Sequence, residues 1–493
     1  MRWERHSHGS CDPFDAAAVT DFNRAMAGIT SYGSYVPYRR LKRAAIGQVL
    51  GVAAGKGERA VASFDEDSVS MAVEATRDAL RGAKPEDTQV LFFATTTPPY
   101  GEKLNAATVG AATMMPLELR ASDLTGSVRA GLSAMLQASD AVKAGAKQAV
   151  AAMADCRLAA PEGSREQSNG DAAAAFVFGN DNVIAEIEAT ASMTREILDL
   201  WRAPGERFPH QWEERFTMTQ SYGPILAQII KTVLEKAKVA PADLAKVVID
   251  APNVKAVDEV ARGLKLDPTK IADSFAPTVG QAGAAHVGLM LTGVLPSSKP
   301  GDRILVVSVA DGADAMVLKV TPAGASFKPV RSVGRQIESK GDVTYANYLK
   351  WREILPTEPP RRPDPDRPAG PPMLRSERWK FGFIGSKCKK CGTPQLPPQL
   401  VCVKCRSREM EAYPFADRTA RIATYAIDRL AYSLNPPTIN VVIDFEGGGR
   451  FLGEMTDCEP DKVAIGDQVE MTFRRLFTAG GVHNYFWKAR PKR

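Results

Sequence analysis

Two short cysteine motifs towards the end of the sequence have the spacing of a metal site. They pair Cys388 with Cys391 and Cys402 with Cys405, each pair in a Cys-x2-Cys arrangement. Each motif directs two thiolates at one ion, so the four residues predict a tetrahedral zinc site. Such a site is closed and leaves no coordination position for a substrate. We therefore predict a structural Zn²⁺ rather than a catalytic one.

Outside these motifs, few side chains are marked as a nucleophile or a base by their type alone. Cys156 is the only cysteine between residues 28 and 325, and it could be a relocated nucleophile or a small buried apolar residue. His286 follows Gly-Ala-Ala within a predicted helix, where it could act in catalysis or simply pack. His210 lies in a Pro-His-Gln-Trp stretch that is typical of a loop. Their roles depend on the fold that positions them.

The composition of the 493 residues is that of a globular protein. Hydrophobic residues make up 44% and charged residues 24%, which excludes a disordered chain. No run of about 18 apolar residues occurs, so we expect no membrane insertion. The net charge of +6 is too small to indicate nucleic acid. Residues 1–27 are polar and lack the apolar segment of a secretory signal, so we interpret them as a flexible leader and expect a cytoplasmic, reducing location.

The clearest boundary in the sequence is the proline-rich and charged segment 357–372. It has no apolar periodicity and should form an extended hinge, within a linker that we place at 326–373. Residues 374–493 carry a charge of +7 and the rest of the chain −1. The basic excess therefore belongs to the C-terminal module.

The segment 28–325 alternates short apolar runs with alanine-rich stretches of helical spacing. The continuous apolar runs predict strands that are buried on both faces; they are 90–96, 149–155, 247–251 and 304–311. Helices are expected at 128–145 and 222–238. This alternation predicts an α/β fold.

The two halves of this segment also resemble each other. Pro85 and Pro241 precede similar strands, Asp155 and Asp311 each end a strand, and both pairs share one sequence offset. The alternative is that such similarities between helix–strand units occur in any α/β protein. We favour a duplicated five-layer α/β/α/β/α fold with halves at 28–185 and 186–325.

Four segments carry a resemblance to a known family. They are ITSYGSYVPYRRL (29–41), SDLTGSVRAGLSAML (122–136), PTVGQAGAAHVGLML (277–291) and DGADAMVLKV (311–320). In this order they resemble the thiolase superfamily, in its branch of hydroxymethylglutaryl-CoA synthase and ketoacyl synthase III. The resemblance implies the five-layer fold, a homodimer through the core, and an acyl-CoA substrate.

The same resemblance implies that the residues for acyl-enzyme chemistry are replaced. The nucleophilic cysteine falls on Val128, which cannot form a thioester. The histidine of the His-x-Pro-Asn motif falls on Asp250, with Asn253 at its end. The glutamate of the synthases falls on Thr96, and the asparagine of the third motif falls near Gln281. We expect Val128, Asn253, Gln281 and Thr96 to contact the substrate.

A retro-aldol cleavage needs only a base and an enolate-stabilising site, so it survives the loss of the cysteine. Asp250 is the candidate base, Tyr222 a second acid or base, and His286 a third candidate. The turn at 126–130 and the Gly312 loop could supply backbone N–H groups for an oxyanion. The alternatives are that Asp250 caps a helix and that Tyr222 merely packs.

The C-terminal module predicts a helix and zinc ribbon at 374–410 and a small β-barrel at 411–493. This order resembles the rubredoxin-like zinc-ribbon and OB-fold family that is often paired with thiolase-fold proteins. The combination also resembles the cysteine-less steroid side-chain aldolases, which work with such a partner, and the resemblance implies that the partner is fused into this chain. We expect the module to dock on the core and to help bind acyl-CoA, and its aromatic residues to fill the barrel rather than to bind single-stranded nucleic acid.

The leading hypothesis is therefore an acyl-CoA carbon–carbon lyase of the aldolase type, with coenzyme A as part of the substrate. One alternative is an acyltransferase like hydroxymethylglutaryl-CoA synthase, with Cys156 as its nucleophile. Another is a non-catalytic scaffold that binds acyl-CoA and channels it between partner enzymes.

Overall fold

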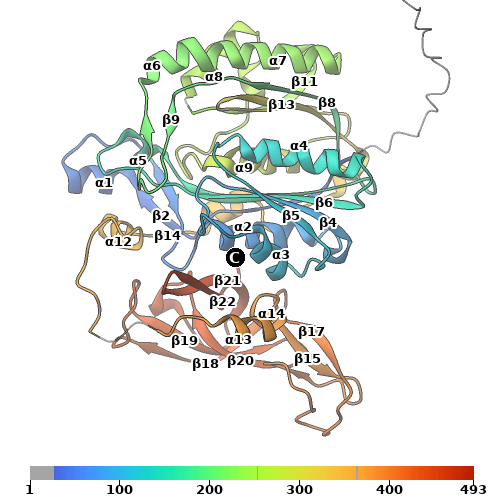
Figure 1. Ribbon diagram of the computed structural model, residues 1–493, viewed down its shortest axis with the longest axis vertical. Helices are drawn as coiled ribbons and strands as arrows, with labels where there is room; N and C mark the ends of the chain where they lie inside the picture. The colour runs from blue at the N-terminus through green and yellow to red at the C-terminus, as the bar shows by residue number, and fades with distance from the viewer. Residues whose placement is uncertain (1–26, 253, 362, 364) are drawn as a thin grey trace, which may run out of the picture.

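Six structural layers are stacked along the long axis of the molecule (Figure 1). The computed structural model describes residues 27–252, 254–361, 363 and 365–493. The predicted leader, apart from its last residue, and the predicted contact residue Asn253 lie outside this described part. Five α/β layers form the core, and a β-barrel lies against the last of them. Among the described residues, the helices are all too short or too polar to cross a membrane.

The core strands form one twisted sheet of nine strands. Their order is β11-β12-β13-β8-β1-β7-β6-β4-β5. Only two residue pairs join β1 to β8, and the sheet folds over at this junction. Its two halves therefore face each other (Figure 1). The strands are β1 (Gly28–Tyr35), β4 (Thr88–Ala94), β5 (Arg120–Leu124), β6 (Gln148–Cys156), β7 (Asp171–Gly179), β8 (Ala185–Thr194), β11 (Leu244–Asp250), β12 (Arg303–Val309) and β13 (Gly312–Val320).

Helices fill the space between the half-sheets and cover their outer faces (Figure 1). The central pair, α4 (Ala130–Lys143) and α9 (His286–Val294), contacts strands of both halves. Helix α9 is buried on nearly all sides, which its apolar sequence allows. The outer helices are α2 (Ser68–Leu80) and α3 (Ala106–Ala112) on one face, and α7 (Gly223–Ala237) and α8 (Val254–Gly263) on the other. The predicted five-layer fold is thus confirmed.

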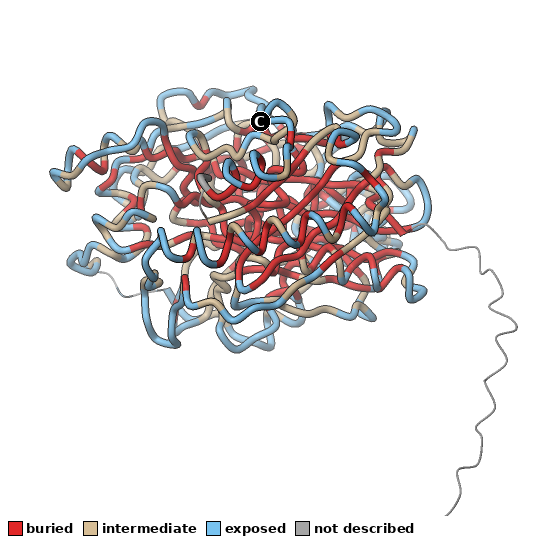
Figure 2. The backbone as a smooth tube through the Cα atoms, turned by 90° about the horizontal axis from the view of Figure 1, so that it is seen from above, coloured by how far each residue is buried: buried red, intermediate tan, exposed pale blue. Residues whose placement is uncertain are grey.

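The topology of the two halves shows the predicted duplication. In each half a parallel pair (β4 with β6, β11 with β12) is followed by two antiparallel neighbours. Pro85 and Pro241, the matching prolines of the two halves, each begin a one-turn 3-10 helix before a strand. These turns are Pro85–Asp87 before β4 and Pro241–Asp243 before β11. The apolar strand interiors are buried at the centre of the molecule (Figure 2).

The predicted linker is only partly a linker. Residues Val333–Glu338 (α11), Gly341–Asp342 (β14) and Tyr345–Trp351 (α12) pack on the core, where β14 joins β2 (Arg39–Lys42) and β3 (Glu58–Val61). The reason is apolar burial, because Tyr345, Tyr348 and Trp351 are at most 5% exposed. The prediction of a linker from residue 326 onwards is therefore wrong, and the extended part begins near residue 355. It ends at α13 (Gly370–Arg375), whose first turn accommodates two prolines.

Shorter elements connect these layers. They are α1 (Arg43–Leu50), α5 (Ser164–Ser168), β9 (Leu200–Trp201), β10 (His210–Gln211), α6 (Glu214–Thr217), the π-turn η2 (Met218–Tyr222), α10 (Pro322–Ser326) and four 3-10 turns, Pro268–Lys270, Gly283–Ala285, Leu295–Ser297 and Pro460–Lys462.

The C-terminal module has the predicted ribbon and barrel. The ribbon consists of β15 (Ile384–Cys388), β16 (Pro394–Gln395) and β17 (Met410–Pro414), preceded by α14 (Glu377–Lys380). The barrel closes in the order β18-β19-β20-β22-β21, with strands Ala420–Asp428, Thr438–Phe445, Arg450–Met455, Gln468–Ala479 (β21) and Val482–Pro491 (β22). Phe473, Tyr485 and Trp487 are buried, and the core contributes to this burial, because Tyr485 Oη donates to Asp67 Oδ2 at 2.7 Å and Arg77 lies over the Trp487 ring.

The barrel docks on helix α2 of the core. Every residue of α2 is buried, since the sheet covers one side and β21 the other. Charged pairs cross this interface, among them Glu74 with Arg490 at 2.7 Å and Arg77 with Asp417 at 2.9 Å. The contact between the module and the core that the sequence predicted is therefore present.

Candidate functional site

A cavity of about 300 Å³ opens in the core beside the N-terminal end of α4. Its walls come from the loops after β4 and β12, the turn before α4 and the β9–β10 hairpin. All of its lining residues lie between Thr96 and Asp311, so the α/β core alone builds it. Loops at the carboxyl ends of strands β4, β6, β11 and β12 meet here, which is where α/β folds commonly place binding sites.

The cavity gathers several of the residues that the sequence singled out. Thr96, Val128, Tyr222 and Gln281 line it. Asp250 lies directly behind Gln281, whose Nε2 donates to Asp250 Oδ1 at 2.6 Å. Four predicted residues from four separate segments therefore line the same cavity. A fifth, Asp250, is joined to one of them by a hydrogen bond.

Asp250 is a buried carboxyl group at the end of β11. It is 2% exposed, and Ser308 Oγ donates to its Oδ2 at 3.2 Å. Burial raises the pKa of Asp250 to about 7, and the hydrogen bonds from Ser308 and Gln281 only partly oppose this. A carboxyl group with this pKa is poised to accept a proton near neutral pH.

Tyr222 points its phenol at a carboxylate that the sequence did not reveal. The Tyr222 hydroxyl donates to Asp199 Oδ2, and both residues line the cavity. Burial and the neighbouring Asp199 raise the pKa of Tyr222, so the phenol is neutral. It ends the π-turn η2, a feature that is frequent at functional sites. Tyr222 can therefore act as a hydrogen-bond donor or relay, and not as a free phenolate base.

His286 is not on the cavity wall. It is 5% exposed and begins α9, whereas the sequence suggested a position inside the helix. Its Nδ1 accepts a hydrogen bond from Ala282 N at 3.3 Å, and burial lowers its pKa to about 4. The prediction of a catalytic histidine therefore finds no support in its position, because the neutral ring is held within the helix packing.

Gly312 also lies next to the cavity rather than in its wall, and shapes the site through its backbone. Its φ is +110°, and a Cβ there would lie 2.0 Å from Met193 O. The adjacent Asp311 lines the cavity, and Arg129 Nη1 donates to Met193 O at 2.7 Å and to Asp311 O at 3.2 Å. Arg129 thereby fastens the Gly312 loop to the turn before α4, the two segments expected to hold an oxyanion.

Four arginines in the cavity wall were missed by the sequence analysis. They are Arg157, Arg165, Arg202 and Arg207. Arg157 directly follows β6, which ends at Cys156, and this position at a strand end is a signal that could have been used. The others come from loops without a recognisable pattern. The core thus supplies positive charge to this cavity, and the expected help of the basic C-terminal module in binding acyl-CoA stays a prediction.

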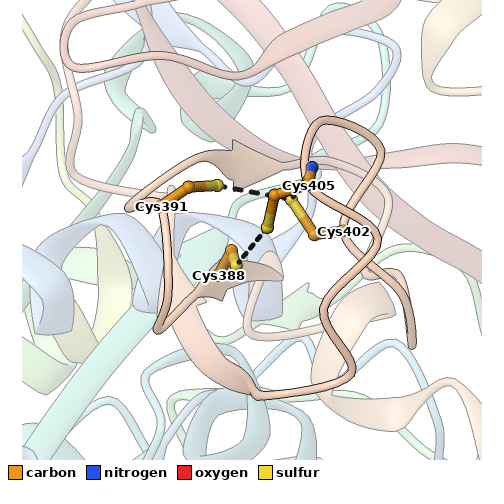
Figure 3. A group of neighbouring side chains, drawn as sticks. All are labelled: Cys388, Cys391, Cys402 and Cys405. Atoms are coloured by element: carbon orange, nitrogen blue, oxygen red, sulfur yellow. Dashed lines mark hydrogen bonds between the residues drawn. The ribbon is translucent and has the colours of Figure 1, made fainter.

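The four cysteines of the ribbon form the predicted metal cluster (Figure 3). The Sγ atoms of Cys388, Cys391, Cys402 and Cys405 lie within 4.8 Å of one another, with two pairs at 3.5 Å. Sulfur atoms about 3.8 Å apart are expected around a tetrahedral zinc with Zn–S bonds of about 2.3 Å. Four thiolates at this spacing fit Zn²⁺, and the ion would hold the two knuckles of the ribbon together.

Removing the zinc is expected to unfold the ribbon and leave the core folded. The strands β15, β16 and β17 are short, so we expect zinc binding to supply most of the ribbon's folding free energy. Hydrogen exchange with and without a chelator measures this: protection should fall in 384–414 and persist in β6 and β7. Equal protection of the ribbon in both samples would contradict a structural zinc.

Comparisons with known proteins agree with this architecture. Residues 234–320 match the C-terminal domain of 3-oxoacyl-[acyl-carrier-protein] synthase III. Residues 382–411 match the ChsH2 rubredoxin-like zinc ribbon, and residues 413–474 match the ChsH2 C-terminal OB-fold domain.

Curated relatives and solved structures cover the core. The hydroxymethylglutaryl-CoA synthase of Archaeoglobus fulgidus is 34% identical over 343 residues, which are 67% of this chain and 99% of that protein. The enzyme of Methanocaldococcus jannaschii is 33% identical over 345 residues, 67% of this chain and 99% of that protein. A structure of hydroxymethylglutaryl-CoA synthase complexed with CoA superimposes with a TM-score of 0.58 at 17% identity, covering 66% of this chain and 90% of that one.

The fold and these likenesses define a thiolase-superfamily core of the condensing-enzyme type. More narrowly, the chain belongs to the hydroxymethylglutaryl-CoA synthase family, with ChsH2-type zinc-ribbon and OB-fold domains fused to its C-terminal side.

Proposed function

We propose that this protein cleaves or forms a carbon–carbon bond next to a CoA thioester by aldol chemistry, without a cysteine acyl-enzyme. The observation that carries the proposal is the pairing of Val128 and Asp250 in one site. An apolar side chain lies before α4, and a buried carboxyl group with a pKa of about 7 lies behind the wall formed by Gln281.

The cleavage needs one base and one oxyanion site. The base accepts the proton of the substrate's β-hydroxyl group, the O–H electron pair forms the new carbonyl, and the Cα–Cβ bond breaks. The electrons of that bond pass to the thioester as an enolate, which is then protonated at Cα. Asp250 lies behind Gln281, whose amide does not carry protons, so the proton would reach the carboxylate through a water molecule. The positive end of the α4 dipole favours the enolate charge.

Similarity to known proteins and the positive charge of the cavity wall both support a CoA thioester as the substrate. Of the similar solved structures, one is a hydroxymethylglutaryl-CoA synthase complexed with CoA, and another is in complex with 3-hydroxy-3-methylglutaryl coenzyme A. In this chain Arg202 and Arg207 are exposed residues of the cavity wall. Guanidinium groups at a cavity mouth suit the phosphates of a CoA thioester.

The alternative of a relocated nucleophile at Cys156 is not supported by its environment. Cys156 is half-buried against the apolar cluster around Val150 and Ala152, and burial together with the nearby Asp171 carboxylate raises the pKa of its thiol well above the usual value. A thiol held in this way stays protonated. Incubation with acetyl-CoA is therefore expected to leave the intact mass of the protein unchanged in mass spectrometry, and an added acetyl group lost in a Cys156→Ala variant would overturn the proposal.

Turnover tests the proposed function directly. The purified protein is incubated with a series of β-hydroxyacyl-CoA thioesters, and the released aldehyde or ketone and the shortened acyl-CoA are measured. Release of both in equal amounts supports the lyase. Binding of acyl-CoA without turnover in either direction would instead favour the non-catalytic scaffold.

We also propose a homodimer that forms through the core. Strand β5 ends the nine-stranded sheet and, within the described residues, pairs with β4 alone. An open edge of this kind can pair with a second copy around a twofold axis. Light scattering coupled to size-exclusion chromatography should give twice the chain mass, and a monomer at micromolar concentration would count against it.

A further inference from the structure

A buried arginine in the cavity wall has no anionic partner. Arg157 lines the cavity just beyond β6 and is only 7% exposed. Its Nη1 donates to Thr96 Oγ1 at 2.7 Å, while its Nε is buried and makes no hydrogen bond. Within the described part of the chain, Asp155 and Asp171 act on the Arg157 charge only through longer-range electrostatics, and Asp171 forms its ion pairs with Arg59 and Arg352 instead.

The two nearest carboxylates are already engaged elsewhere. Asp155 accepts hydrogen bonds from the threonines of the loop after β4 and from Ala284 N at 2.7 Å. Asp171 accepts from the Arg157 backbone N–H at 2.8 Å and from Arg352 Nη2 at 2.6 Å. Neither of them can turn towards the Arg157 guanidinium without losing these bonds.

A buried and unpaired charge is unfavourable in a folded protein. Taking a cation out of water costs several kcal/mol unless an anion compensates it. Burial lowers the pKa of Arg157, and the nearby carboxylates of Asp155 and Asp171 oppose this only in part. Guanidinium nevertheless stays protonated at neutral pH, so the cavity wall carries a fixed positive charge. A negatively charged ligand atom would offset its desolvation.

We propose that Arg157 is the anion-binding residue of the cavity and takes a negatively charged oxygen of the acyl group. This inference rests on the proposed function. The depth of Arg157 separates it from exposed Arg202 and Arg207, which suit the CoA phosphates. Its neighbours are instead Thr96 and the Gln281–Asp250 pair, and its charge contributes to the electrostatics of Asp250.

The anionic oxygen has two chemical sources. It is either a carboxylate that the acyl chain carries before reaction, or the enolate oxygen that forms when the Cα–Cβ bond breaks. The first source acts on binding and the second on turnover. In both, the planar guanidinium supplies charged hydrogen bonds that water cannot replace in a closed site.

Binding of two CoA thioesters of equal chain length tests the first source. Glutaryl-CoA and pentanoyl-CoA differ in a terminal carboxylate, and calorimetry gives their dissociation constants. If Arg157 holds a carboxylate, the wild type binds glutaryl-CoA at least tenfold more tightly, and Arg157→Gln abolishes the preference. Arg207→Gln serves as the matched control, because it should weaken both ligands by the same factor.

Steady-state kinetics tests the second source. If Arg157 holds the enolate, glutaryl-CoA has no advantage, and Arg157→Gln lowers kcat by about 10²–10³-fold with KM little changed. Arg157→Lys should then recover part of kcat, which a merely structural role would not show. Thermal unfolding of each variant confirms that the fold is kept.

The outcomes separate this inference from the proposed function. Acyl-CoA binding with no chain preference, together with an unaffected kcat or no turnover at all, overturns the role of Arg157 and leaves CoA binding intact. Failure of every CoA thioester to bind overturns the proposed function itself, and the anion site with it.

Discussion

Replacement of Asp250 by asparagine is expected to lower kcat for aldol cleavage by about 10²–10⁴-fold, the contribution typical of a positioned general base. The change keeps the size of the side chain and its hydrogen bond from Gln281, which donates to Oδ1 at 2.6 Å. It removes only the ability to accept a proton. KM should change little, since Asp250 lies behind the cavity wall. Steady-state kinetics with a cleaved β-hydroxyacyl-CoA measures both constants.

A matched control is available at the other end of the same strand. Asp243 is exposed just before β11, so Asp243→Asn makes the same chemical change away from the cavity. Its kcat should equal that of the wild type. Asp250→Asn with more than half of the wild-type kcat would exclude Asp250 as the base, and attention would pass to the cavity carboxylates Asp199 and Asp311.

The raised pKa of Asp250 also fixes the direction of the pH dependence. The base form is deprotonated, so kcat should rise about tenfold per pH unit below pH 7 and level off above it. Folding responds in the opposite direction, because a carboxyl group whose pKa is raised by burial favours the folded state while it is protonated. That contribution is lost as the pH rises through 7. Asp250→Asn should therefore be relatively more stable at pH 8 and show a flat activity profile across pH 7.

The parts of this structure that follow from sequence are those with a strong local pattern. The apolar runs at 90–96 and 149–155 could only be strands covered on both faces, and β4 and β6 occupy them. The cysteine spacing gives the zinc cluster without any knowledge of the fold. The repeat at Pro85 and Pro241 gives the duplication, since both prolines begin the same short turn.

Helix α2 shows why other parts could not be predicted. Its sequence, SVSMAVEATRDAL, has the charged residues Glu74, Arg77 and Asp78 on what reads as a solvent face. That face is buried because the barrel, more than 390 residues away in sequence, supplies Arg490 and the backbone of Phe473. Local periodicity contains no information about such a partner.

The residues of the candidate site likewise divide into those that the sequence predicted and those that it did not. Thr96 and Asp250 were found because they fall on the glutamate and the histidine of the synthases that the sequence resembles, and both lie where strand ends of an α/β fold converge. Asp199 was missed because it joins Tyr222 across 23 residues of irregular chain. The cavity arginines of the β9–β10 hairpin were missed for the same reason, since that hairpin has only two residues per strand.

The second large effect is expected at the interface between the barrel and the core. Arg490 is fully buried and donates to Glu74 Oε2 at 2.7 Å and to Glu470 Oε1 at 2.9 Å. Burial alone would raise the pKa of Glu74, but Arg490 and Arg77 hold it well below its usual range. Arg490→Met removes one cation of this buried network, while Glu74 keeps Arg77 at 2.7 Å and Glu470 keeps Arg331 at 2.8 Å. Breaking a buried pair costs about 3–5 kcal/mol, so the loss here should be at most of this size. Urea unfolding should show this loss.

An exposed pair on the same barrel gives the control. Arg450 pairs with Asp444 at 2.6 Å, with 66% and 48% of the two side chains exposed, and Arg450→Met should cost at most about 1 kcal/mol. The double variant Glu74→Gln, Arg490→Met should destabilise by less than the sum of the two single changes, because both single changes break the same Glu74–Arg490 pair. Equal effects of Arg490→Met and Arg450→Met would show that the buried network does not hold the barrel on the core.

Loss of the interface should also reach the cavity. The β21–β22 hairpin contacts the loop after β4, where Tyr100 Oη accepts a hydrogen bond from His483 N at 2.8 Å, and the rings of the two residues lie 4.6 Å apart. That loop carries Thr96, which lines the cavity and orients Arg157. A barrel that detaches in Arg490→Met would free this loop, so KM for the acyl-CoA should rise severalfold while the zinc content stays unchanged. An unaltered KM in a variant with a detached barrel would show that the core positions Thr96 by itself.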